Sequence, residues 1–178
     1  MMASLIDRMV RAAKLDVNLY EEVEADKGSM RQAIIVVVLS SVAGGIGSIG
    51  VLGISGLIFG TIFALIGWFI WAFLVYIIGT KLLPEPQTKS DMGELLRTMG
   101  FSSAPGVIRV FGIIPFLGAL ASIIAGVWML VAMVIAVRQA LDYKSTWRAI
   151  GVCVIGYVIV LVVIYGFIFG AMGFSNPF

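Results

Sequence analysis

The chain has 178 residues, of which 61% are hydrophobic and 12% are charged, and its mean hydropathy is +1.09. This composition excludes an ordinary soluble domain, because twelve basic and ten acidic side chains are too few to cover the surface of a globule of this size. The chain has no histidine, one cysteine and a net charge of +2, which argues against a Ser/His/Asp triad, an HExxH zinc site, a histidine-ligated haem, an internal disulfide and a nucleic-acid partner.

Residues 1–31 form a polar segment ahead of the apolar part of the chain. From Leu5 to Ala13, apolar residues recur at helical spacing and basic residues occupy the other face. This pattern predicts an amphipathic helix on the cytoplasmic membrane surface, with three basic side chains available to anionic headgroups: Arg8, Arg11 and Lys14. A second short helix, capped by Asp16, would present Glu21 and Glu22 to water or to a basic partner. The segment is therefore either a structural surface helix or a dedicated docking segment for a protein partner.

Residues 32–178 are predicted to form one membrane domain. No charge occurs between Arg31 and Lys81, a stretch that would be about 70 Å long as one helix. A single crossing needs only about 20 residues, so we expect this stretch to fold back at its glycine-rich part, near residue 50. With polar loops at 81–91 and 138–148, the sequence predicts an all-α fold with five spans, at about 33–50, 56–79, 100–114, 119–137 and 149–170.

The sequence contains signals for where the third predicted span begins, bends and ends. Asp91 and Glu94 have the spacing of a helix N-cap with an acidic third residue, so a helix should begin there and enter the membrane near Ser102. Pro105 is expected to kink this helix, and Pro115 to form the turn that ends it.

The distribution of basic residues predicts the orientation. They precede the first span or lie between spans two and three and between spans four and five, whereas the opposite connections carry no charge. Because cytoplasmic loops hold the excess of Lys and Arg, the N-terminus is expected in the cytoplasm and the C-terminus outside. Arg97 and Arg138 lie in these cytoplasmic regions and are further candidates for surface contacts.

Arg109 is the one charge inside a predicted span, where no acidic residue is present to neutralise it. A charge at membrane depth is unfavourable by about 2.5–3.5 kcal/mol and often marks function. Three interpretations stay open. The side chain snorkels to lipid phosphates or caps backbone carbonyls freed by Pro105, it binds an anionic lipid or ligand, or it lines a substrate pathway.

Two glycine pairs have the spacing that lets membrane helices approach closely, Gly56 with Gly60 and Gly166 with Gly170. We expect them to pack helices within one subunit, with a contact to a second chain as the alternative. That alternative includes a homo-oligomer.

Several short stretches, in this order and spacing, resemble the Yip (Ypt-interacting protein) domain family. They are Leu15–Asp26, Leu95–Gly100, Ala104–Gly106, Ile114–Gly118, Val127–Leu130 and Val137–Ala140. The resemblance implies a five-pass membrane domain with a cytoplasmic N-terminus. In eukaryotes such proteins are associated with Rab-type GTPases and vesicle formation, but this chain is more similar to the compact prokaryotic members.

The sequence thus predicts a membrane adaptor or scaffold without enzymatic activity, metal or cofactor. It would bind membrane lipid, anionic lipid included, and a protein partner through its cytoplasmic face. The compact form implies the cell (inner or plasma) membrane, or an endomembrane in a eukaryote. The alternatives are a component of a small-solute transporter or channel with Arg109 in the pathway, and an accessory subunit of a larger membrane complex.

Overall fold

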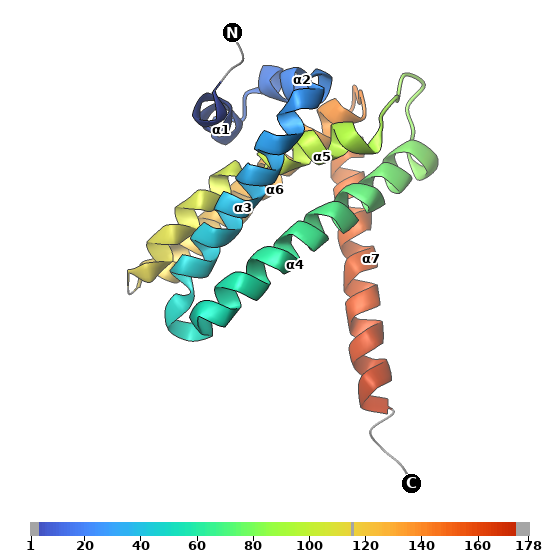
Figure 1. The fold of residues 1–178 in the computed structure, drawn as a ribbon. Coiled ribbons are helices and arrows are strands. Elements are labelled where there is room, and N and C mark those ends of the chain that lie inside the picture. Colours follow the sequence, from blue (N-terminus) through green and yellow to red (C-terminus); the bar gives the residue numbers. More distant parts are fainter. Residues whose placement is uncertain (1–3, 115, 174–178) are drawn as a thin grey trace.

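The computed structural model describes residues 4–114 and 116–173, with side chains described as far as residue 166 (Figure 1). The fold is all-α, and no strand occurs among the described residues. In chain order the elements are α1 (Leu5–Ala13), α2 (Val17–Ala25), η1 (Lys27–Ser29), α3 (Met30–Gly47), α4 (Ile49–Ile77), η2 (Ile78–Leu82), α5 (Met92–Phe101), η3 (Ala104–Ile113), α6 (Leu117–Ala140) and α7 (Thr146–Gly173).

Four helical stretches are long and apolar enough to cross a membrane: Lys27–Gly47, Ile49–Leu82, Leu117–Ala140 and Thr146–Gly166. They correspond to the first, second, fourth and fifth predicted spans. The boundary between the first two lies slightly earlier than expected, because α3 ends at Gly47 and α4 begins at Ile49. The expected glycine break is present at Gly53, whose φ of 64° lies in the region that glycine adopts without strain.

The third predicted span, 100–114, differs from one continuous helix. α5 begins with the predicted capping box, in which Asp91 and Glu94 each accept a hydrogen bond from the other residue's backbone N–H at 2.8 and 2.9 Å. The helix ends at Phe101, and the chain restarts as the 3-10 helix η3 with Pro105 in its first turn. Pro105 therefore does not kink a continuing helix, because proline lacks the N–H that a helix interior needs but fits the first turn of a new helix. The expected turn at Pro115 lies outside the described residues.

α3 and η3 run side by side in the same direction. At one end, a Cβ on Gly100 would lie 2.8 Å from the Cβ of Ala33, and at the other, Gly112 meets the backbone of Gly47. The fourteen residues of α3 between these contacts measure about 21 Å along the helix. The facing segment runs from Gly100, at the end of α5, to Gly112 in η3, and it covers this distance because its 3-10 part rises about 2.0 Å per residue.

The remaining long helices surround this pair (Figure 1). α6 packs against η3, and α4 packs against α3, while α7 contacts α6 and the end of α4 near the polar loops. From there α4 and α7 diverge toward the other end of the molecule (Figure 1). α1, α2 and α5 cover the end of the bundle at which the charged loops lie.

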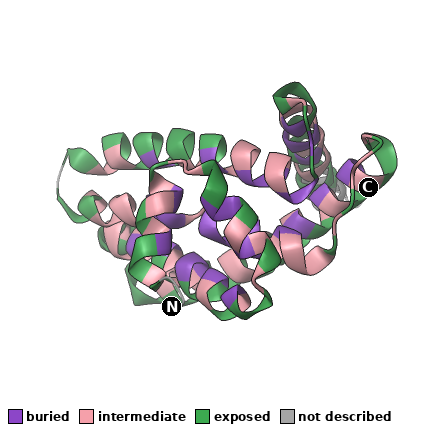
Figure 2. Ribbon diagram, turned by 90° about the horizontal axis from the view of Figure 1, so that it is seen from above, coloured by how far each residue is buried: buried purple, intermediate pink, exposed green. Residues whose placement is uncertain are grey.

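The outer sides of the long helices are apolar and exposed (Figure 2). On α4, for example, large side chains are 48–67% exposed at Phe59, Ile62, Phe63 and Ile66. Soluble monomers rarely expose apolar patches of this extent, because the hydrophobic effect disfavours their contact with water. The protein is therefore an integral membrane protein with several membrane-embedded helices.

The close contact between α3 and η3 predicts a strong effect of one methyl group. A Cβ at Gly47 would overlap the carbonyl oxygen of Arg109, whereas a Cβ at Gly67 on α4 would meet no heavy atom within 4 Å. We expect Gly47→Ala to lower the free energy of unfolding by about 1–3 kcal/mol, as overpacking does elsewhere, and Gly67→Ala to leave it unchanged. Denaturation curves in detergent measure both. Equal stability of the two variants would contradict the packing described.

Candidate functional site

The charged end of the bundle is built on Arg8, a buried residue of α1 that is 4% exposed. Its Nε donates to Glu22 Oε1, its Nη1 to Gln32 Oε1 and its Nη2 to Asp26 Oδ2, each at 2.9 Å. The three acceptors come from α2, from the residue after it and from α3. One guanidinium thus joins the two N-terminal helices to the first long helix.

Arg11 extends the same group of charges. Its Nε donates to Asp16 Oδ2 at 2.8 Å, and its Nη1 donates to the second oxygen of Glu22 at 2.5 Å. These hydrogen bonds to Arg11 lower the pKa values of Asp16 and Glu22, and the bond to Arg8 lowers the pKa of Asp26. We call this group the Arg8 cluster; it consists of Arg8, Arg11, Asp16, Glu22, Asp26 and Gln32.

Arg97 ties α5 to the end of α2. It is buried, and its Nε donates to the carbonyl oxygen of Val23 at 2.9 Å, while Nη2 donates to the carbonyl oxygen of Glu24. Both carbonyls belong to the last turn of α2, where a cation also interacts favourably with the helix dipole. Arg97 therefore stabilises the packing of α5 against the C-terminal end of α2.

The other predicted contact residues lie nearer the surface. Lys14 and Glu21 are exposed, and Glu21 accepts a hydrogen bond from Gln139 of α6. Arg138 is half-buried and donates to the carbonyl oxygen of Tyr143 at 3.2 Å. The structure thus gathers Arg8, Arg11 and Glu22 in one cluster and leaves Lys14 and Glu21 accessible.

Glu24 was not singled out in the sequence, yet it is the most perturbed carboxyl group of this face. Its Oε2 atom is buried and has no hydrogen-bond partner among the described residues. Burial, with smaller contributions from the nearby Glu21, Asp142 and Glu94, raises the pKa of Glu24 to about 8. No sequence signal marks this residue, because its burial arises only when α2 packs on α5 and α6.

Some apolar side chains of α1 pack against the bundle and others point away from it. Leu5 and Met9 pack against the core beneath α1, whereas Ile6 is 74% and Val10 45% exposed. At the end of α1, Trp128 of α6 donates its indole N–H to the carbonyl oxygen of Ala13 at 2.7 Å. α1 is thereby fixed on the rim of the bundle with two large apolar side chains pointing away from it.

The two polar loops are joined by Glu85, a contact that the sequence did not predict. It accepts hydrogen bonds from the backbone N–H groups of Lys144 at 3.0 Å and Ser145 at 3.3 Å, and it lies 3.5 Å from the Nε of Arg148. These interactions lower the pKa of Glu85. The loops between α4 and α5 and between α6 and α7 therefore form one connected surface beside the N-terminal helices.

Arg109 occupies a different part of the molecule, at the side of η3 that faces α3. Its backbone lies against Gly47, at the end of α3 remote from the charged loops. Its guanidinium reaches back toward them, since Nη2 donates to the carbonyl oxygen and the hydroxyl of Ser40 at 3.1 and 3.0 Å. Nε donates to the carbonyl oxygen of Gly106, next to Pro105, at 3.1 Å. Arg109 therefore caps backbone carbonyls, and its guanidinium lies beside Ser40, about 15 Å along α3 from Met30.

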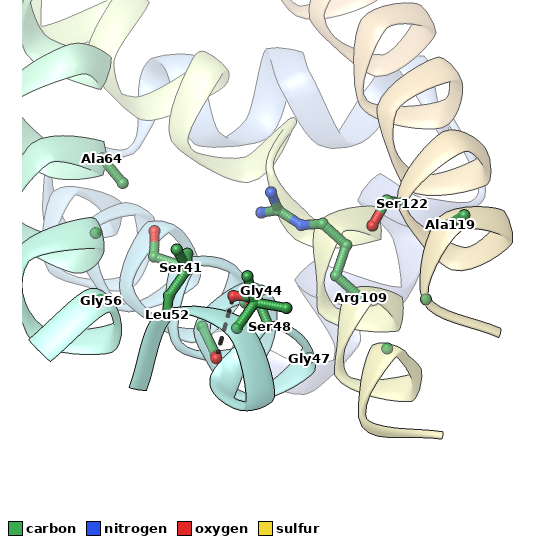
Figure 3. Close-up of a pocket in the computed structure, with 15 residues that line it drawn as sticks. Ser41, Gly44, Gly47, Ser48, Leu52, Gly56, Ala64, Arg109, Ala119 and Ser122 are labelled. Atoms are coloured by element: carbon green, nitrogen blue, oxygen red, sulfur yellow. Dashed lines mark hydrogen bonds between the residues drawn. The ribbon is translucent and has the colours of Figure 1, made fainter. Parts of the chain in front are cut away.

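Arg109 lines two cavities. The first has a volume of about 580 Å³ and is lined mainly by small residues of α3, α4, η3 and α6 (Figure 3). The second, about 1070 Å³, is an apolar cleft between α6 and α7. Gly56 and Gly60 face the first cavity, and a Cβ at Gly60 or Gly166 would meet no heavy atom within 4 Å. The surroundings of Gly170 lie outside the described part of the structure.

Neither region resembles a metal centre. Within residues 4–114 and 116–166, no group of three or more Asp, Glu, Cys or His residues is arranged to hold a metal ion. The chemistry available is that of charge and hydrogen bonding at the polar end, and of one guanidinium beside apolar space in the bundle.

The chain matches the protein-family model described as the Yip1 domain over residues 18–169. No curated protein and no solved structure matches the chain. The matched region begins within α2 and extends into α7, so it includes all the long helices and both cavities.

Arg8 provides a test of the charged end. Replacing it in Arg8→Gln removes the charge that pairs with Glu22 and Asp26, and we expect the free energy of unfolding to fall by about 1–3 kcal/mol, because the acceptors are partly exposed. Amide exchange in α1 and α2 should increase. Arg31→Gln, at an exposed position, is the control and should change neither quantity. Unchanged exchange in Arg8→Gln would contradict this role.

Glu24 predicts a pH dependence. Because its folded pKa is raised above the unfolded value of about 4.5, folding takes up a proton, and stability decreases as the pH rises from about 4.5 to about 8. Glu24→Gln should therefore raise the melting temperature by a few degrees at pH 9 and change little near pH 4.5. Thermal melts in detergent across this pH range measure the difference. A gain that is the same at both pH values would contradict the assignment.

Proposed function

Since the chain belongs to the Yip1 family, whose domain model spans residues 18–169, we propose that it is a membrane adaptor or scaffold without enzymatic activity. It binds protein partners and lipid headgroups through its charged face, which is the surface formed by α1, α2 and the polar loops at the charged end of the bundle. The observation that carries this proposal is the Arg8 cluster with Arg97, which fastens α1 and α2 onto the bundle as one preformed polar surface. A rigid surface of this kind lowers the entropic cost of binding a partner.

We infer five spans with the N-terminus in the cytoplasm. The support is that the chain from Gly100, at the end of α5, through η3 runs beside α3 over about 21 Å and in the same direction. With η3 counted as a crossing, all basic loops lie on the side of α1, as the positive-inside rule requires. The C-terminal end of α7 then lies on the non-cytoplasmic side of the membrane. We propose that this membrane is the cell membrane in a prokaryote or an endomembrane in a eukaryote.

The proposed contacts follow from exposure. Lys14 and Glu21 are accessible and would contact a protein partner, whereas Arg8, Arg11, Glu22 and Arg97 hold the surface in shape. Ile6 and Val10 point away from the bundle on the rim, where they would enter the membrane interface beside basic side chains. Arg138 supports the adjoining loop and would contribute charge to the same surface.

The test is a pull-down of the full-length protein in nanodiscs from its own membranes, with mass spectrometry of bound proteins. We expect one protein to be recovered stoichiometrically, and its recovery to be lost in Lys14→Glu and Glu21→Lys, since these changes reverse exposed charges. Lys89→Glu, in the loop between α4 and α5, is the matched control and should retain the partner. Recovery of the chain alone, or equal loss in the control, would overturn the adaptor proposal.

One observation favours a second candidate, a small-solute pathway that passes Arg109. Arg109 lines both cavities, of which the first reaches the turn between α3 and α4 and the second reaches the start of α7. In a Cys153→Ser background, a cysteine at Ser122 would then react with water-soluble thiol reagents from either side of the membrane. Protection from both sides would oppose a pathway. An accessory subunit of a larger complex is the third option, and the pull-down would identify its larger partners.

A further inference from the structure

We propose that the space at Arg109 is a binding site for an anionic phospholipid. The phosphate lies at the Arg109 guanidinium, in the cavity of small residues, and an acyl chain lies in the apolar cleft between α6 and α7. This site is about 15 Å from the charged face along α3, so it is separate from the proposed contact surface for a protein partner.

The first argument is the charge of Arg109, which nothing in the bundle neutralises. Residues 32–80, 95–141 and 149–178 contain no Asp or Glu. The hydrogen-bond partners of the guanidinium are the neutral carbonyl oxygens of Gly106 and Ser40 and the Ser40 hydroxyl. These acceptors satisfy N–H groups but leave the net charge, which is unfavourable at membrane depth without an anion.

The second argument is that one edge of the guanidinium remains available. Nε and Nη2 make the hydrogen bonds to Gly106 and Ser40, whereas Nη1 makes none within the described part of the chain. Arg109 lines both cavities and Ser122 lines the first, and Figure 3 shows the guanidinium pointing from η3 toward the side of α3 and α4. Arginine N–H groups bind phosphate oxygens strongly, and a hydroxyl would add one more hydrogen bond.

The third argument is the shape of the space beside Arg109. The walls of the first cavity are formed by residues with short side chains, among them Gly44, Gly60, Gly118 and Ser122, which leave about 580 Å³ next to the charge. A Cβ at Gly44 would already lie 3.3 Å from the Arg109 Cζ, so larger residues there would displace the guanidinium. Room for a headgroup and access to the charge therefore depend on the same small residues.

The fourth argument selects a lipid over a water-soluble anion. The adjoining cleft of about 1070 Å³ is lined by apolar residues such as Trp71, Met129 and Leu130, and it opens between the helices. Leu130 on α6 and Val158 on α7 are 59% and 50% exposed, so the cleft is accessible from the hydrocarbon. A molecule with an anionic head and a long apolar chain matches both cavities, whereas a soluble anion would leave the cleft empty.

The experiment is native mass spectrometry of the delipidated full-length protein, titrated separately with phosphatidylglycerol and with phosphatidylcholine of identical acyl chains. We expect one phosphatidylglycerol per chain, with an affinity about tenfold higher than that of phosphatidylcholine. In Arg109→Gln this ratio should fall close to one. In Arg148→Gln, which removes an exposed arginine at the charged end, the ratio should be unchanged. Equal affinities in the wild type, or an equal fall in both variants, would overturn the proposal.

A second pair of variants keeps the test valid if Arg109→Gln does not fold. Gly126 lines the cleft, and a Cβ there would meet no heavy atom within 4 Å, so Gly126→Leu places an apolar side chain in the cleft. It should lower phosphatidylglycerol affinity about tenfold, while Gly67→Leu, at an equally open position outside both cavities, should not. Binding unaffected by Gly126→Leu would show that the cleft holds no acyl chain. Tighter binding of oleate than of phosphatidylglycerol would overturn the choice of a phospholipid.

Discussion

The structure depends on the close contact between α3 and η3. At hydrocarbon depth every backbone polar group needs a partner within the protein, and a short 3-10 helix meets this requirement when other helices cover it. Gly47 and Gly112 bring the two backbones together, and α6 packs against the other side of η3. The bundle is thus organised around its shortest apolar helix, with α4 and α7 added at the periphery.

The charged end and the bundle follow different physical rules. At the charged end, arginines pair with carboxylates from segments distant in sequence, as Arg8 does with Glu22 and Asp26, and each pair joins two helices. In the bundle, Arg109 has only carbonyl and hydroxyl partners. At the charged end the carboxylates neutralise the arginines, whereas the charge of Arg109 is not neutralised by its partners. The same residue type therefore fastens helices in one region and offers a binding group in another.

Periodicity and charge predicted the all-α fold, four of the long helices and the capping box at Asp91 and Glu94, because these features depend on residues close in sequence. The third span was only partly predicted, since Pro105 can kink a helix or begin a new one, and only the packing beside α3 decides. The partners of Arg8 and the burial of Glu24 could not be predicted, because they involve residues 14–24 positions away or elements brought together by folding. Whether an arginine on a predicted surface is free or paired is likewise decided by tertiary structure.

The 3-10 geometry of η3 sets the direction in which Arg109 points. Successive residues turn by about 120° in a 3-10 helix and by about 100° in an α-helix. Over the five residues from Ala104 to Arg109 the difference amounts to about 100°, with an axial shift of about 2.5 Å. An α-helical winding of the same residues would turn the guanidinium away from Ser40. The 3-10 winding of η3 is therefore what places this single charge beside α3.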